Sequence, residues 1–147
     1  MFRSTMKKGG NKMPNREFHM TLGAVTGSLF FAVEELLSQI NNEEHKDDNK
    51  FNISWESLIF KAILGVFLGS IGGILPDLLE PARNPNHRSF FHSWLLLLSM
   101  LLVIAFKISK KSTLKGFLSH LFLPFTAGYS SHLLADMTTA KGLPAIK

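Results

Sequence analysis

Long apolar runs with almost no charge limit the folds that this chain can adopt. The clearest run is Trp94 to Phe106, which contains no charged residue. Charged residues make up only 18% of the chain and gather in a few blocks, so the middle of the sequence is largely bare of charge. This distribution is typical of a membrane protein or of a fully buried bundle. No stretch alternates apolar and polar residues as a strand does, so we expect an all-α fold.

The apolar runs predict an antiparallel, membrane-embedded bundle of about four helices. We expect helices over about Arg16–Ile40, Ser54–Leu75, Ser89–Ile108 and Leu114–Ala135. The third is the best predicted single membrane span, because its apolar stretch reaches the roughly 20 residues that cross a bilayer. Residues 1–15 are basic and polar, which predicts a disordered tail, and residues 16–147 then form a single helical membrane domain.

Glycines at four-residue spacing support the membrane interpretation. Gly65, Gly69 and Gly73 follow one another along the second predicted helix. In a soluble helix each would cost roughly 1 kcal/mol relative to Ala. In a membrane bundle the same glycines let another helix backbone approach closely. Gly23 and Gly128 share faces of their predicted helices with histidines, so we expect small residues to line a seam that opens at a polar site.

Composition excludes several classes of function. The chain has no cysteine, which excludes disulfides, thiolate metal sites and a cysteine nucleophile. Its formal charge is +5, but its basic blocks are not interleaved with aromatic residues, and no nucleic-acid partner is expected. A metal ion would need histidine and carboxylate ligands, which suit zinc, manganese or iron.

The segment Pro76–Ser93 concentrates ionisable residues between two apolar runs. It holds two carboxylates, two histidines and two arginines, and we expect its three prolines to keep it out of regular structure. In an antiparallel bundle, the start of the first helix and the end of the fourth lie beside this segment. Candidate ligands from all three places therefore meet at one end of the bundle: His19, Asp77, Glu80, His87, His92, His132 and Asp136.

This convergence predicts a metal site. His132 and Asp136 are four residues apart and share one helical face. Metal sites in bundle cores are built from such side chains on facing helices. A single histidine at a helix end is more often a cap or a surface residue, and a lone His-x-x-x-Asp is weak evidence. The joint placement is the stronger argument, since ionisable groups near membrane depth are functional candidates.

Three motifs in this order resemble the YdjM family of bacterial inner-membrane proteins. They are Gly-Gly-Ile-Leu-Pro-Asp (72–77), His-Arg-Ser-Phe-Phe-His-Ser (87–93) and Gly-Tyr-Ser-Ser-His-Leu-Leu-Ala-Asp-Met-Thr-Thr-Ala-Lys-Gly-Leu-Pro (128–144). The family is described as metal-dependent hydrolases, with a LexA-binding label on one member. The resemblance covers about residues 15–146 and implies a multi-pass protein with one or two divalent ions, zinc before manganese or iron. By position, the implied ligands are His19, Asp77, His87, His92, His132 and Asp136.

The sequence departs from the family pattern in two places. Leu79 stands where the family has a second aspartate after Asp77, and Glu80 follows one position later. The segment 89–91 replaces the family's Gly-x-Thr. Both departures bear on whether a second ion can be held.

These observations predict a membrane-bound, metal-dependent hydrolase, with a phosphoester or a lipid as its substrate. Glu80 is the candidate general base or orienting residue, and Arg88 can pair with an anionic substrate group. The alternatives are a non-catalytic membrane protein with a structural metal or a hydrogen-bonded His/Asp cluster, and a regulator-binding membrane protein. Lysines and arginines are more numerous at the site end, which predicts a cytoplasmic site.

Overall fold

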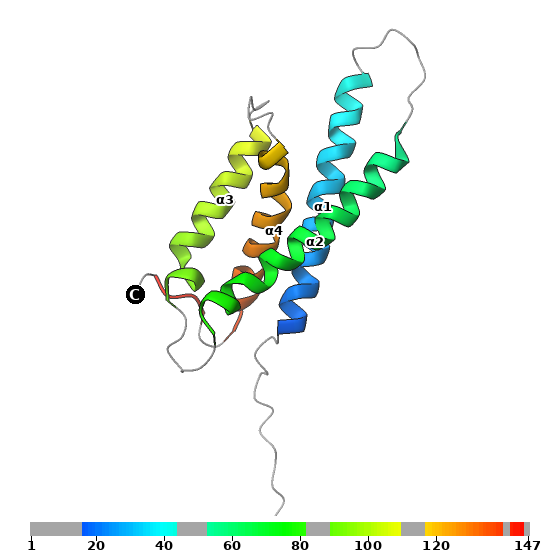
Figure 1. The fold of residues 1–147 in the computed structure, drawn as a ribbon. Helices are drawn as coiled ribbons and strands as arrows, with labels where there is room; N and C mark the ends of the chain where they lie inside the picture. The colour runs from blue at the N-terminus through cyan, green and yellow to red at the C-terminus, as the bar shows by residue number, and fades with distance from the viewer. Residues whose placement is uncertain (1–15, 44–52, 82–88, 110–116, 140–141, 146–147) are drawn as a thin grey trace, which may run out of the picture.

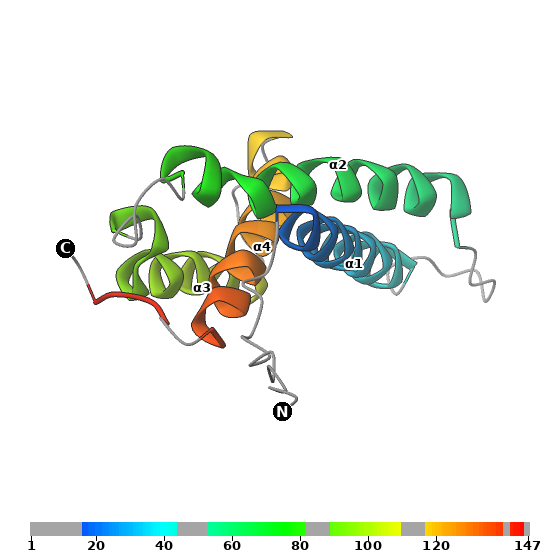
Figure 2. The ribbon, with the colours of Figure 1, turned by 90° about the horizontal axis from the view of Figure 1, so that it is seen from below.

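The computed structural model is an all-α bundle, and it describes residues 16–43, 53–81, 89–109, 117–139 and 142–145. Within these ranges the elements are α1 (Arg16–Glu43), α2 (Trp55–Leu79), the 3-10 helix η1 (Phe90–His92), α3 (Trp94–Ser109) and α4 (Phe117–Met137). Helices α1, α2 and α4 pack against one another, and α3 packs against α4 (Figures 1 and 2). The prediction of an all-α bundle is confirmed, and the described residues include no strand.

Helices α1, α2 and α4 meet through glycine backbones. A Cβ atom at Gly27 would lie 2.5 Å from the carbonyl oxygen of Gly65 and 2.7 Å from the Cα of Gly69. A Cβ atom at Gly128 of α4 would lie 2.8 Å from the same Cα of Gly69. Backbone atoms on the opposing helix cannot rotate away as a side chain can, so any larger residue would push the helices apart. The predicted seam of small residues is therefore present, and it fixes the relation of three helices.

Helix α2 continues through Pro76 and ends only at Leu79. The expectation that Pro76 leaves regular structure is wrong. Proline lacks an N–H and so removes one hydrogen bond from the last turn, but its carbonyl oxygen still accepts from the amide of Glu80 at 2.9 Å. Asp77 is consequently held on a helix rather than in a loop.

Helix α3 begins at Trp94, later than the predicted start at Ser89. The preceding residues form η1, and Ser93 is extended, with φ −97° and ψ 154°. The amide of Trp94 donates to the carbonyl oxygen of Pro144 at 3.0 Å, which ties the start of α3 to the C-terminal segment. With 16 residues, α3 is shorter than the roughly 20 that cross a bilayer.

Among the described residues, two helices are long and apolar enough to cross a membrane, α1 and α2, by length and composition alone. The expectation that the third helix is the best single span is thus wrong, because η1 takes its first turn. Helix α4 extends to Met137, two residues past the predicted end, and α1 extends to Glu43 instead of Ile40. The longer α4 places Asp136 on the helix.

The apolar core lies between α3 and α4. Leu97, Tyr129 and Leu133 are buried there, and Leu143 from the C-terminal segment completes the cluster. The Tyr129 hydroxyl donates to the carbonyl oxygen of Phe91 at 3.0 Å, so the core also holds η1 in place.

A polar network joins α1 and α2 toward their other end. Glu35 is buried, and its carboxylate accepts from Gln39 Nε2 at 2.7 Å and from the Ser57 hydroxyl at 2.6 Å. Lys61 Nζ lies 2.5 Å from its second oxygen. Gln39 Oε1 in turn accepts from the amide of Ser54 at 2.9 Å, just before α2 begins. Donors and acceptors match throughout this network.

Candidate metal centre

The polar residues predicted to share one end of the bundle lie together where α1 begins and α2 and α4 end, at the lower end in Figure 1. They come from four elements of the fold: His19 from α1, Asp77 from α2, His92 from η1, and His132 and Asp136 from α4. The histidines and Asp136 are almost fully buried, whereas 30% of the Asp77 side chain is exposed. The cluster is therefore reached by solvent from the side of Asp77.

The orientation of the His132 ring is fixed by a backbone carbonyl of the glycine seam. Its Nδ1 lies 2.7 Å from the carbonyl oxygen of Gly73. A carbonyl oxygen only accepts hydrogen bonds, so Nδ1 must carry the proton and donate it. The Nε2 atom of a neutral His132 then presents a lone pair to the centre of the cluster. The neighbouring glycine of α2 lets α4 approach closely enough to make this bond, because a Cβ atom at Gly72 would lie 2.9 Å from the amide nitrogen of Tyr129.

His92 is fixed by Glu80. Its Nδ1 lies 2.9 Å from Glu80 Oε2, and the same carboxylate accepts from the amides of Ser89 at 2.9 Å and Phe91 at 3.1 Å. The Ser89 hydroxyl makes a further short bond to Glu80 Oε1. Burial raises the pKa of Glu80, but the bonds from Ser89, His92 and Phe91 outweigh it and lower the pKa to about 2. The ionised carboxylate only accepts, so His92 donates from Nδ1 and its Nε2 faces inward.

The two inward-facing nitrogens oppose each other. His92 Nε2 and His132 Nε2 are 3.2 Å apart, and both are acceptors when the imidazoles are neutral. Two lone pairs at this distance repel unless a cation or a proton lies between them. Burial lowers the pKa of His92, whereas Asp77, Glu80 and Asp136 raise it more strongly, so that the net shift is upward. The surroundings therefore favour positive charge at this point, whether a proton or a metal ion carries it.

The donor spacing fits a single divalent ion. Four atoms face one another: Asp77 Oδ1, His92 Nε2, His132 Nε2 and Asp136 Oδ2. Their five measured separations run from 3.2 to 3.7 Å. Ligand bonds of about 2.0–2.2 Å in tetrahedral geometry put donor atoms ~3.3–3.6 Å apart. Asp77, His92 and His132 thus fit such an ion in both chemistry and spacing, and Asp136 Oδ2 lies 3.6 Å from both histidine nitrogens.

His19 stands beside this set. Its Nε2 lies 3.6 Å from Asp136 Oδ1, the oxygen that faces away from His92 and His132, and its ring stacks on that of His132 with centroids 3.8 Å apart. Its Nδ1 is buried with no hydrogen-bond partner. Leaving such a group unpaired costs on the order of 1–3 kcal/mol. With His132 and Asp136 it forms a second possible ligand group.

Not every predicted residue can be placed. His87 and Arg88 lie outside the described residues. His120 of α4 is not part of the cluster and pairs with Glu34, with Nδ1 3.1 Å from Oε1. Sequence reasoning missed the carbonyl of Gly73 and the amides of Ser89 and Phe91, because backbone groups leave no signature in residue type.

The sequence model of the YdjM inner membrane protein family matches residues 13–146. No curated protein and no solved structure matches the chain significantly. The chain belongs to the YdjM inner membrane protein family.

Proposed function

We propose that this member of the YdjM inner membrane protein family is a metal-dependent hydrolase. The observation that carries the proposal is the pair of buried histidine nitrogens, 3.2 Å apart, flanked by the carboxylates of Asp77 and Asp136. In the proposal Asp77, His92 and His132 hold one divalent ion, with Asp136 beside it. Zinc is the first candidate and manganese or iron the alternatives, because the ligand set combines imidazole with carboxylate.

A bound divalent ion would supply Lewis-acid polarisation of the scissile bond and would lower the pKa of an attacking water toward ~7. The protein residues prepare the site for that chemistry. Glu80 orients His92 so that its Nε2 faces the centre of the cluster, and the carbonyl of Gly73 does the same for His132. Such partners commonly set ligand orientation and affinity. Glu80 already accepts four hydrogen bonds, from Ser89, Phe91 and His92, which favours orientation over the general-base role also expected from the sequence.

Two other residues are proposed to provide access to the metal site and proton transfer at it. The partial exposure of Asp77 supports an opening for water and substrate on its side of the cluster. The Nδ1 of His19 has no partner and is available to hold or release a proton beside the reacting centre. Arg88 remains a predicted contact for an anionic group. We place the site on the cytoplasmic side of the inner membrane, following the distribution of lysine and arginine.

Purified full-length protein in detergent tests the proposal. After zinc or manganese loading it should hydrolyse a generic phosphodiester or a phospholipid, and Asp77→Ala should lower the rate by at least ~100-fold. Glu35→Gln, which alters a buried carboxylate outside the cluster, should leave the rate within a few-fold. Bound metal with no turnover of either substrate class would contradict the hydrolase and favour a structural metal site.

A further inference from the structure

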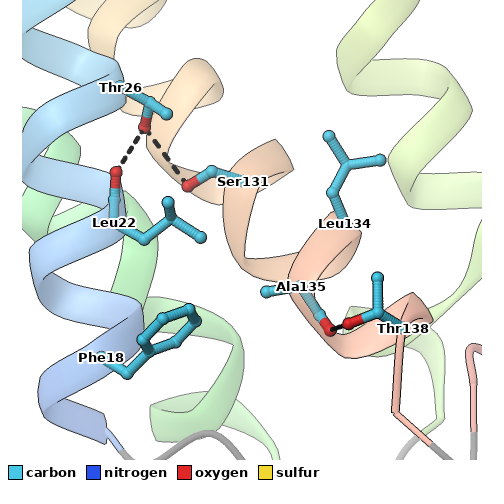
Figure 3. Close-up of a pocket in the computed structure, with 7 residues that line it drawn as sticks. All are labelled: Phe18, Leu22, Thr26, Ser131, Leu134, Ala135 and Thr138. Atoms are coloured by element: carbon cyan, nitrogen blue, oxygen red, sulfur yellow. Dashed lines mark hydrogen bonds between the residues drawn. The ribbon is translucent and has the colours of Figure 1, made fainter.

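An apolar groove runs along the bundle next to the His/Asp cluster. It has a volume of about 460 Å³ and lies between α1 and α4 (Figure 3). Its walls are Phe18, Leu22, Thr26, Ser131, Leu134, Ala135 and Thr138. The volume is within the range of sites that bind small molecules, about 300–1,000 Å³.

The groove begins at the end of the bundle that carries the cluster. Phe18 adjoins His19 in sequence, and their rings make an edge contact with centroids 5.7 Å apart. Ala135 likewise adjoins Asp136. From Phe18 to Thr26 the groove follows α1 inward for ~12 Å, at about 1.5 Å per residue. That length is most of one leaflet of a hydrocarbon core about 30 Å thick.

The lining has no polar group left for a ligand to bind. Thr26 and Ser131 bond to each other at 3.2 Å and to backbone carbonyls of their own helices, as Figure 3 shows for Thr26 and Leu22. The Thr138 hydroxyl donates to the carbonyl oxygen of Ala135 at 2.7 Å. A polar ligand would lose its hydrogen bonds to water here and gain none, whereas a hydrocarbon chain would lose nothing.

The groove is also open toward lipid. Phe18 is 48% exposed and Leu134 is 41% exposed, and both lie on its walls. Helix α1 is one of the two helices able to cross the membrane by length and composition. With α1 across the membrane, the open side of the groove would face the acyl chains of the bilayer, and a chain could enter from the side.

We infer that this groove holds the acyl chain of a membrane lipid whose head group lies at the His/Asp cluster, so that the substrate is a lipid. The inference rests on the proposed function and names its substrate class. A chain that leaves the bilayer for an apolar groove gains little free energy, since both environments are apolar. The groove therefore orients the substrate, while the polar cluster provides the attraction.

Photo-crosslinking tests the inference. The full-length protein is placed in nanodiscs of phosphatidylethanolamine and phosphatidylglycerol that contain a phospholipid with a diazirine in its acyl chain. After irradiation, labelled positions should concentrate in residues 18–26 and 131–138. Ala135→Leu fills the groove and should lower this labelling roughly tenfold, as expected for overpacking of a close-fitting site. Ala105→Leu, the same change at an exposed position of α3, should leave it unchanged.

Labelling spread evenly over the exposed faces of α2 and α3, or labelling of the groove that Ala135→Leu does not reduce, would overturn the inference. Metal content measured on the same samples separates the two proposals. Loss of groove labelling in Ala135→Leu with full metal content supports the groove assignment. Absence of metal from the unaltered protein contradicts the proposed hydrolase, while retained groove labelling would still establish the lipid site.

Discussion

Two buried polar clusters, the Glu35 network and the His/Asp cluster, lie at different levels of this bundle. They differ in how completely their hydrogen-bond acceptors are matched by donors. Around Glu35, every acceptor meets a donor: the carboxylate receives bonds from Gln39 and Ser57, and Lys61 balances its charge. Around His132, acceptors meet acceptors, because the nitrogens of His92 and His132 face each other and the carboxylates of Asp77 and Asp136. One cluster is complete within the protein, and the other requires a positive charge from outside it.

This difference is the reason to propose a structural role for the Glu35 network and a metal site for the His/Asp cluster. Buried polar groups are normally satisfied, and each exception needs an explanation. The Glu35 network needs none, and it joins α1 to α2. The His/Asp cluster combines opposed lone pairs with an unpartnered nitrogen on His19, and the proposed cation would account for the opposed nitrogens of His92 and His132.

The largest expected effect is on metal affinity when a residue at the centre of the cluster is removed. His132→Ala deletes one Nε2 donor and the contact with the Gly73 carbonyl, so metal affinity should fall by more than ~100-fold. Competition with a chromophoric chelator measures this. His120→Ala is the matched control, because His120 lies on the same helix but pairs with Glu34. Equal losses of metal affinity in both variants would mean that the effect is not specific to the His/Asp cluster.

A smaller loss is expected from the residue that orients His92. Glu80→Gln removes the charge that accepts four hydrogen bonds and leaves His92 less firmly held. Metal affinity should fall about 10–100-fold, which is typical when a partner of a ligand is changed. Isothermal titration with zinc compares it with Glu56→Gln, an exposed change at the start of α2. If Glu80→Gln binds metal as tightly as that control, Glu80 does not position His92.

The Glu35 network should respond in stability and not in metal binding. Lys61→Met leaves the Glu35 carboxylate without its cation, and the free energy of unfolding should fall by about 1–3 kcal/mol. Thermal unfolding in detergent measures the change, with elemental analysis of the same protein. Loss of metal from this variant would mean that the two clusters are coupled.

The smallest effect is expected at the bond between α4 and η1. Tyr129→Phe removes the hydroxyl that donates to the Phe91 carbonyl and should cost about 0.5–1.5 kcal/mol of stability. Because Glu80 still holds His92, metal affinity should change only a few-fold. A decrease in affinity as large as that of Glu80→Gln would show instead that the core, and not the carboxylate, sets the position of His92.

Residue spacing predicted the bundle and much of its polar end. The predictions drawn from the glycines of α2 and from the four-residue spacing of His132 and Asp136 do not change when helix boundaries shift by a few residues, because both depend on the helical period alone. The break before α3 was not predictable from spacing. It depends on the amides of Ser89 and Phe91 bonding to Glu80, and such backbone bonds are not visible in the apolar pattern.

The central claim is that the His/Asp cluster holds a divalent metal ion and not only a shared proton. Elemental analysis of purified full-length protein, combined with X-ray absorption at the metal edge, tests this most directly. The account predicts about one zinc, manganese or iron ion per chain, bound by nitrogen and oxygen at about 2.0–2.2 Å, and loss of that ion in His92→Ala. Protein that stays free of metal after loading with each of these ions would contradict it and leave a proton between His92 and His132.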